Sequence, residues 1–213
     1  VIGCGYFAQN HLNGWREVDG AEIVALCDRD SEALNQSAGF FGIERTYSDV
    51  ETMLAETDLD YVDVIIQVGS HRELVELAAA RKTHVICQKP FAPSVEDARN
   101  MVVSCVQSGV MLMVHENFRL QTPIRALKRV LTNRAIGNPF FGQISFRSAF
   151  DVYANQPYLA TDDPFIVSDL GIHLLDLARF LMGDVEQMYT RTQRVNPTIK
   201  GEDVATSILD IKG

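Results

Sequence analysis

Residues 1–8 read VIGCGYFA, in which a short apolar run leads directly into two glycines and an alanine with the spacing G-x-G-x-x-A. This spacing is typical of the turn between the first strand and the first helix of a dinucleotide-binding fold. Gly3 is expected to permit the tight turn, Gly5 to let a pyrophosphate approach the backbone, and Ala8 to let the helix pack closely on the strand. The motif is weak by itself, because other glycine-rich turns share it.

A second signal comes from Asp28, which follows the next apolar run 20 residues after Ala8. A carboxylate in this position accepts hydrogen bonds from the hydroxyls of an adenosine ribose. Its charge repels the 2′-phosphate of NADP, so NAD is the expected cofactor. NADP stays open, because the neighbouring Arg29 can turn toward such a phosphate. Tyr6 and Phe7, inside the glycine turn, are also expected to contact the cofactor.

Short apolar runs alternate with longer stretches of helical period as far as about residue 115. The further runs lie at 21–27, 61–66, 84–87 and 110–114, and the helical stretches lie near 7–18, 30–39, 48–56, 71–82 and 94–108. Strands that alternate with helices predict an α/β fold with a doubly wound parallel sheet of the Rossmann type.

The pattern changes after residue 114. A helix is expected near 123–134, a strand at 140–150, a second helix over 168–182, and strands near 185–195 and 203–211. We therefore expect two domains: a Rossmann domain that binds NAD or NADP over 1–116, and an α/β domain for substrate and oligomerisation over 117–213, with a largely antiparallel open sheet. Because the sequence starts inside one apolar run and stops just after another, truncation at both ends is expected, with part of the second domain missing.

The composition narrows the classes of function. The 213 residues are 46% hydrophobic and 22% charged, with a formal net charge of −9. An acidic chain without a basic stripe argues against a nucleic-acid partner, which needs Lys and Arg to neutralise phosphates. No apolar run approaches the roughly 20 residues that span a bilayer, so no membrane partner is expected. The four cysteines show no metal-ligand spacing and indicate buried thiols in a cytoplasmic protein.

Lys89 is the first candidate catalytic residue. It follows the apolar run 84–87, in the tripeptide QKP at 88–90. The carboxyl edge of the sheet, where this lysine is expected, is where doubly wound folds bind their ligands. A merely solvated lysine is the simpler alternative, because most lysines are exposed.

Asp169, His173 and Asp176 form the second candidate group. They fall at i, i+4 and i+7 on one stripe of the predicted helix, next to an apolar stripe. His173 is therefore expected at the rim of a core, with carboxylates about one turn away on both sides, which suits a histidine base oriented by an acid. The alternative is a helix cap at Asp169 and a structural histidine that a carboxylate satisfies.

Together these residues resemble the Gfo/Idh/MocA family of oxidoreductases, which includes inositol and sugar dehydrogenases, over essentially the whole chain. His71, which opens a predicted helix, the QKP tripeptide and the segment HENFR at 115–119 add to the resemblance. The family usually has Glu where this chain has Gln88. The loop 67–70 also lacks the usual proline and is one residue short, which changes the expected contacts with the cofactor.

The resemblance implies that His71, Gln88 and Lys89 help to bind the nucleotide. It also implies that Lys89, Asp169 and His173 form the catalytic set without a metal, and that Asp176 is structural or orienting. Asn117 and Arg119 suit either a cleft lining or a polar hinge between domains.

The implied reaction is reversible hydride transfer between a secondary alcohol carbon of a polyol, sugar or sugar derivative and the nicotinamide. In it, His173 takes the hydroxyl proton, Asp169 orients the imidazole, and Lys89 stabilises the developing alkoxide. Two alternatives stay open: a glycosidase that uses NAD with no net redox change, and a non-catalytic regulator that senses NAD. The expected assembly is a homodimer or homotetramer that pairs open sheet faces.

Overall fold

The apolar runs of the first part of the chain become the parallel strands of one sheet. In the computed structural model, which describes residues 1–212, β3 (Tyr61–Val64), β4 (His84–Cys87) and β5 (Leu112–Val114) pair in that order, and β1 (Leu26–Cys27) pairs with β2 (Thr46–Tyr47). Ile2 joins the two parts, because it bridges Cys27 on one side and Val64 on the other. Across the sheet the order is therefore β2, β1, the Ile2 segment, β3, β4 and β5. If the Ile2 segment is counted as the first strand in the chain, this is the order 3-2-1-4-5-6 of a Rossmann sheet, so the predicted fold is confirmed.

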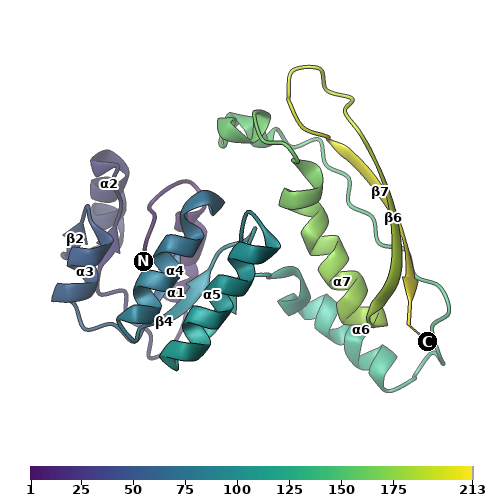
Figure 1. The fold of residues 1–213 in the computed structure, drawn as a ribbon, viewed down its shortest axis with the longest axis horizontal. Coiled ribbons are helices and arrows are strands. Elements are labelled where there is room, and N and C mark those ends of the chain that lie inside the picture. Colours follow the sequence, from purple (N-terminus) through teal and green to yellow (C-terminus); the bar gives the residue numbers. More distant parts are fainter. Residues whose placement is uncertain (213) are drawn as a thin grey trace. The chain divides into compact units, whose positions relative to one another are not determined.

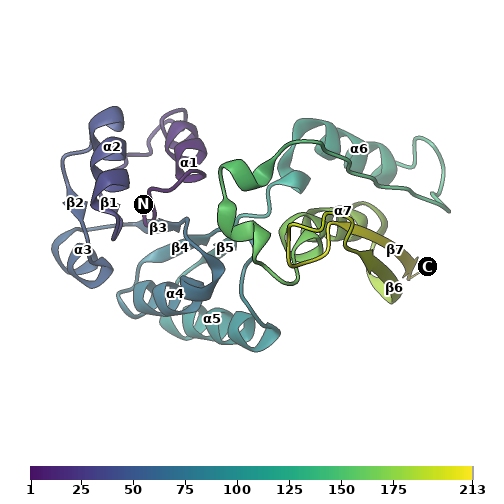
Figure 2. The same ribbon diagram turned by 90° about the horizontal axis from the view of Figure 1, so that it is seen from above.

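Helices cover both faces of this sheet. Figure 2 shows α1 (Ala8–Trp15) and α2 (Ser31–Phe41) above the strands, and α4 (His71–Ala80) and α5 (Val95–Ser108) below them. A further helix, α3 (Val50–Glu56), follows β2. Side-chain caps fix several helix starts: the carboxylate of Asp30 accepts from two backbone N–H groups of α2, and Ser94 accepts from the N–H of Asp97.

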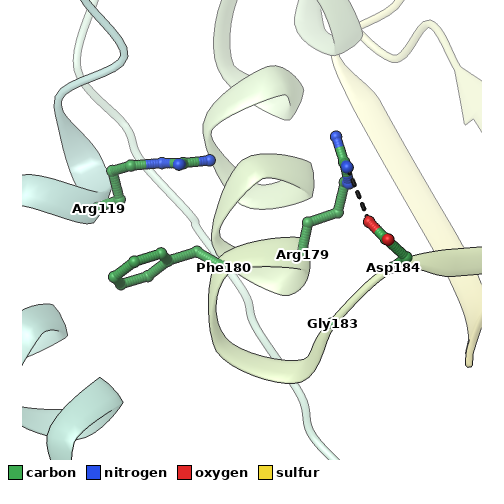
Figure 3. Close-up of a pocket in the computed structure, with 5 residues that line it drawn as sticks. All are labelled: Arg119, Arg179, Phe180, Gly183 and Asp184. Atoms are coloured by element: carbon green, nitrogen blue, oxygen red, sulfur yellow. Dashed lines mark hydrogen bonds and ion pairs between the residues drawn. The ribbon is translucent and has the colours of Figure 1, made fainter. Parts of the chain in front are cut away.

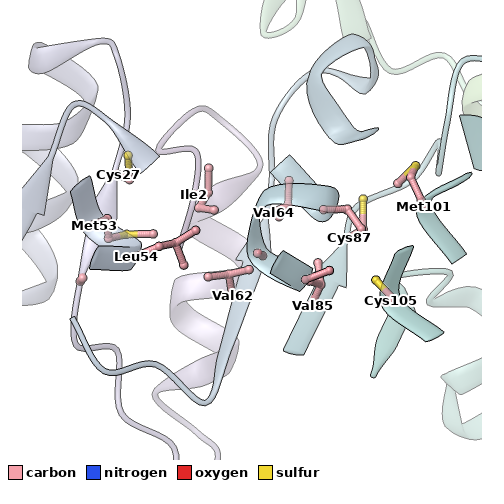
Figure 4. Packing of buried hydrophobic residues seen from close by; sticks show 14 residues of the cluster. Ile2, Cys27, Met53, Leu54, Val62, Val64, Val85, Cys87, Met101 and Cys105 are labelled. Atoms are coloured by element: carbon pink, nitrogen blue, oxygen red, sulfur yellow. The ribbon is translucent and has the colours of Figure 1, made fainter. Parts of the chain in front are cut away.

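The core of this part of the chain packs against β3 and β4 (Figure 4). The strands contribute Val62, Val64 and Val85, all at most 1% exposed, because parallel strands that carry helices on both faces bury both sets of side chains. Met53 of α3 and Met101 of α5 fill the space beside them. The sheet is thus a rigid platform for the loops at its carboxyl edge.

All four cysteines are buried and free. Burial raises the pKa of Cys4 and Cys27 to about 11 and that of Cys87 to about 12, and it raises the pKa of Cys105 as well. The thiols therefore stay protonated and shielded at neutral and mildly alkaline pH. We expect no alkylation of these four residues by iodoacetamide in the native protein and complete alkylation after unfolding, as measured by peptide mass spectrometry. Rapid native labelling of any of them would contradict this packing.

The chain divides into two units, Val1–His115 and Glu116–Gly213, and the second has a different construction. It contains α6 (Thr122–Thr132), α7 (Ile172–Met182) and an antiparallel hairpin of β6 (Val185–Gln193) and β7 (Val204–Ile211), seen in Figure 1. The helix α6 contacts α7, where Lys128 Nζ lies 5.4 Å from the ring centroid of Phe180. The expected antiparallel sheet is confirmed as this hairpin.

The prediction of a strand at 140–150 is wrong for the structure described here, because this stretch is irregular. Its alternating pattern is real, but a strand also needs a partner for its backbone hydrogen bonds, and none of residues 1–212 pairs with it. Its phenyl groups consequently stay in solvent, with Phe140 99% exposed.

The helix expected from residue 168 also begins differently. Val167–Gly171 forms a π-helical turn, and the α-helix starts only at Ile172. Glu202, from the β6–β7 connection, holds this turn by accepting hydrogen bonds from the backbone N–H groups of Phe165 and Val167, both at 3.1 Å. π-turns of this kind occur often at functional sites. Across residues 1–212, no helix combines the length and the apolar character needed to cross a membrane.

Candidate active site and cofactor site

The glycine turn has the geometry that a dinucleotide requires. Gly3 adopts φ +98°, and a Cβ at this position would lie 2.2 Å from the carbonyl oxygen of Ile65, so only glycine fits. At Gly5 a Cβ would meet no atom within 4 Å, so the backbone here borders open space. Ala8, which starts α1, is 0% exposed. Gly3 thus has the conformation that the predicted tight turn requires, and the open space at Gly5 leaves room for a ligand.

The same turn offers backbone donors for a phosphate. Ala8 N–H donates to the carbonyl of Gly5, while no acceptor among residues 1–212 meets the N–H groups of Gly5, Tyr6 and Phe7. The first turn of α1 carries no acidic side chain, and Phe7 provides no side-chain cap. Free N–H groups at a helix start, beside open space at Gly5, fit the pyrophosphate of a dinucleotide.

Asp28 holds this turn in place from the end of β1. Its Oδ2 accepts the N–H of Cys4 at 2.6 Å, and its Oδ1 accepts the N–H of Asp30 at 2.9 Å. The half-buried carboxylate therefore lies beside the phosphate turn, where an adenosine ribose is expected. Arg29, next to it, is exposed.

His71 is a support for the loops at the sheet edge. Its ring is fully buried, with Nδ1 3.1 Å from the carbonyl oxygen of Phe91 and Nε2 3.0 Å from that of Ile66. It thereby ties the loop after β3 to the loop after β4. Because both ring nitrogens face main-chain carbonyls, any contribution of His71 to nucleotide binding is through the shape of these loops.

Gln88 leads into a buried chain of polar groups that sequence reasoning missed. Its Oε1 accepts the backbone N–H of Lys89 at 2.7 Å, and its Nε2 lies 3.0 Å from Nε2 of His11. The other ring nitrogen of His11 is 2.8 Å from Oδ2 of Asp63, which also accepts from Trp15 Nε1 at 2.8 Å. The one available signal was Asp63 itself, a charge inside the apolar run 61–66.

In the second unit, His173 is held by a carboxylate and an aromatic ring. Its Nδ1 lies 2.5 Å from Oε1 of Glu116, and its ring stacks on Phe118 with centroids 4.1 Å apart and planes 6° from parallel. His173 is only 4% exposed. The sequence prediction gave the orienting role to Asp169. Glu116 was missed, because it is 57 residues away and looks like an ordinary solvated glutamate.

Asp176 has a structural partner. Both of its carboxylate oxygens accept from the guanidinium of Arg119, with Arg119 Nε 2.7 Å from Oδ2, and this contact raises the pKa of Arg119. The pair ties the segment after Glu116 to α7, the helix that carries His173. A structural or orienting role was expected of Asp176, and the structure pairs it with Arg119 as its anchor.

The pocket in Figure 3 lies next to this anchor, and Arg119, Arg179, Phe180, Gly183 and Asp184 line it. Arg119 lies over the ring of Phe180, with 5.3 Å to the centroid, and Arg179 pairs with Asp184 at 2.8 Å. With both guanidinium groups engaged by carboxylates, the pocket offers little free positive charge.

Asp169 lies on the π-turn among other acidic and phenolic groups. Burial raises the pKa of Asp162 and of Tyr158, and the negative charge of Asp169 adds to both shifts. A carboxylate near a partly buried acid and a phenol can accept hydrogen bonds from hydroxyl groups. The second unit therefore combines a held imidazole with a cluster of oxygen acceptors.

Comparison with known proteins agrees with this geometry. A family model described as "Oxidoreductase family, NAD-binding Rossmann fold" matches residues 1–116. The chain belongs to the Gfo/Idh/MocA family. The model of the Gfo/Idh/MocA C-terminal domain matches residues 124–213 of this family member. The resemblance read from the sequence is thereby confirmed.

Several Gfo/Idh/MocA relatives are very similar to the chain. A D-apiose dehydrogenase from Paraburkholderia graminis is 58% identical over 98% of this chain and 56% of its own length, and one from Rhizobium rhizogenes is 56% identical over 99% of this chain and 61% of its own length. A crystal structure of an oxidoreductase from Agrobacterium radiobacter with NAD+, L-tartaric acid and magnesium superposes with a TM-score of 0.97, at 56% identity, over 99% of this chain and 62% of that one. The chain thus spans about three fifths of the length of these relatives.

Proposed function

We propose that the protein that contains this chain is an NAD-dependent dehydrogenase that oxidises a secondary alcohol of a sugar or sugar-like polyol. The observation that carries the proposal is the buried His173, which is held through Nδ1 by Glu116 and stacked on Phe118. The relatives named D-apiose dehydrogenase, and a relative named myo-inositol 2-dehydrogenase at 29% identity, support a sugar or polyol as the substrate class.

The free N–H groups at Gly5, Tyr6 and Phe7 would hold the pyrophosphate of NAD, and Asp28 would hold its adenosine ribose. Bound NAD supplies the hydride acceptor. Because a carboxylate selects against a 2′-phosphate, NAD is preferred over NADP. Gln88 and Lys89, at the carboxyl end of β4, complete the set of residues proposed for the cofactor half of the site.

His173 is the proposed base. A carboxylate at Nδ1 favours the tautomer in which Nδ1 carries the proton, so Nε2 is left with a lone pair that can take the hydroxyl proton. Glu116 then stabilises the imidazolium that forms. We therefore transfer the orienting role from Asp169 to Glu116. Asp169 is retained as an acceptor for substrate hydroxyls, and the ammonium of Lys89 stabilises the developing alkoxide.

The test uses the full-length protein with NAD or NADP and a panel of D-apiose, other sugars, inositols and unrelated secondary alcohols. Formation of reduced nicotinamide is followed by its near-ultraviolet absorbance, and His173→Ala serves as the inactive control. Reduction of NAD by a sugar or polyol, lost in the control, is the expected result. Release of sugar from a glycoside without reduced cofactor would instead indicate a glycosidase, and NAD binding without any turnover would indicate a sensor.

Glu116→Gln tests the orienting role directly. Glutamine keeps an oxygen acceptor for Nδ1–H but removes the charge that stabilises the imidazolium, so kcat is expected to fall on the order of 100-fold. The dissociation constant for NAD should stay unchanged, because Glu116 belongs to the second unit and is not among the residues proposed to hold the nucleotide. Steady-state kinetics and NAD titration measure the two quantities. A variant with full kcat would remove Glu116 from the mechanism.

We further propose a cytoplasmic homodimer or homotetramer. Support comes from the β6–β7 hairpin, where Tyr189 and Ile208 pair across the two strands on one face and are both more than half exposed. Apolar side chains on an open sheet face favour pairing with a second copy. Light scattering of the full-length protein would give the oligomeric state, and a monomer at micromolar concentration would contradict the proposal.

A further inference from the structure

The hydrogen bonds around Gln88 fix the protonation of His11. Oε1 of Gln88 accepts the N–H of Lys89, so the amide nitrogen must be the atom that faces His11. An amide NH₂ group can only donate, and therefore Nε2 of His11 accepts. The single ring proton is then on Nδ1, where it donates to Asp63 at 2.8 Å.

All the donors in this chain of groups point the same way. Lys89 N–H donates to Gln88, Gln88 donates to His11, and His11 donates to Asp63. Trp15 Nε1–H adds a second donor to the same oxygen of Asp63. Hydrogen bonds in such a series polarise one another, and they strengthen further when the last acceptor is a carboxylate in a dry interior.

The chain of groups is rigid because it is buried. Asp63 is 2% exposed, Gln88 6% and His11 8%. The Oδ1 of Asp63 has no hydrogen-bond partner among the described residues, so this carboxylate is anchored through Oδ2 alone. The ring of His115 packs on that of His11, with centroids 4.3 Å apart. A displacement of His11 would remove one of the two side-chain donors to Oδ2 of this buried carboxylate, which is costly.

We propose that Asp63, His11 and Gln88 are positioning residues for Lys89, and that Gln88 keeps His11 in the neutral Nδ1–H form. This inference rests on the proposed function only in treating Lys89 as the catalytic lysine. A glutamate at position 88 offers no donor to Nε2, so it would demand an imidazolium. With Gln88, the same groups stay linked by hydrogen bonds. Compared with a glutamate at this position, the site holds one carboxylate fewer and His11 carries one proton fewer.

The first test determines directly which ring nitrogens of His11 carry a proton. Full-length protein is labelled with ¹⁵N-histidine, and the His11 resonances are assigned by their loss in His11→Asn. At neutral pH we expect a protonated Nδ1 and an unprotonated Nε2 in the wild type, and two protonated nitrogens in Gln88→Glu. A wild-type proton on Nε2, or on both nitrogens, would overturn the inference, whether or not any sugar is oxidised.

The second test separates positioning from folding. Gln88→Met keeps the size of the side chain but breaks both hydrogen bonds, and kcat is expected to fall about tenfold or more. Gln88→Glu, which keeps the chain of groups connected, should recover most of that kcat. Melting temperatures of both variants show that the fold persists. Full kcat in Gln88→Met would overturn the positioning role, whereas a wild type that oxidises no substrate would overturn the proposed function and leave the resonance test intact.

Discussion

Replacement of His173 by Ala is expected to lower kcat for sugar oxidation by about 10²- to 10⁴-fold, because it removes the proposed proton acceptor. NAD binding should persist, since the pyrophosphate and ribose contacts belong to the first unit. Stopped-flow or steady-state formation of reduced nicotinamide measures the loss, and titration calorimetry measures the affinity for NAD.

Asp176→Asn is the matched control for this variant. Asp176 lies on the same helix, three residues after His173, and its carboxylate pairs with Arg119 and not with the imidazole. The pair is partly exposed, so its removal should cost no more than about 1 kcal/mol of stability and leave kcat within about threefold of the wild-type value. Equal losses of kcat in the two variants would mean that the helix, and not the imidazole, carries the effect.

Gly3→Ala is expected to destroy the nucleotide site. The new Cβ would lie 2.2 Å from the carbonyl oxygen of Ile65, and φ +98° is unfavourable for alanine. Backbone strain alone costs about 1–3 kcal/mol, and the overlap with a strand carbonyl adds to it. Thermal unfolding should therefore show a clear loss of stability, together with loss of NAD binding.

Gly5→Ala separates folding from binding. Its Cβ would meet no protein atom within 4 Å, so the free energy of unfolding should change by less than about 0.5 kcal/mol. The methyl group would occupy the space proposed for the pyrophosphate, and the dissociation constant for NAD should rise about tenfold or more, as one lost phosphate contact requires. If Gly5→Ala binds NAD as well as the wild type, the phosphates do not lie against this residue.

The fold of the first unit could be predicted because its signals are local. The strands β1, β3 and β4 are short, mostly apolar runs in which no side chain is exposed, and the glycine spacing predicts the conformation of its own turn. The stretch 140–150 shows the limit of this reasoning. Its alternation predicts a strand that the structure lacks, because strand formation depends on pairing with another segment, which no local pattern reports.

The residues of the candidate site likewise fall into those that a local pattern predicts and those that depend on distant contacts. Gly3, Asp28 and Lys89 are recognisable because a fixed spacing places them at the carboxyl edge of a parallel sheet. Glu116 and His11 are not, because their roles arise from contacts over 57 and 77 residues of sequence. A buried charge at Asp63 was the one local sign that a polar partner had to exist, but it did not identify that partner.

The two hydrogen bonds of Asp28 set a condition for any attempt to convert the cofactor preference to NADP. The obvious change removes the carboxylate, to make room for a phosphate and to stop the charge repulsion. That same carboxylate, however, holds the N–H groups of Cys4 and Asp30. A serine or alanine at position 28 would therefore loosen the turn that we propose to hold the pyrophosphate, a group that both nucleotides share. Successful redesign has to supply new acceptors for these two amides before it supplies a cation for the phosphate.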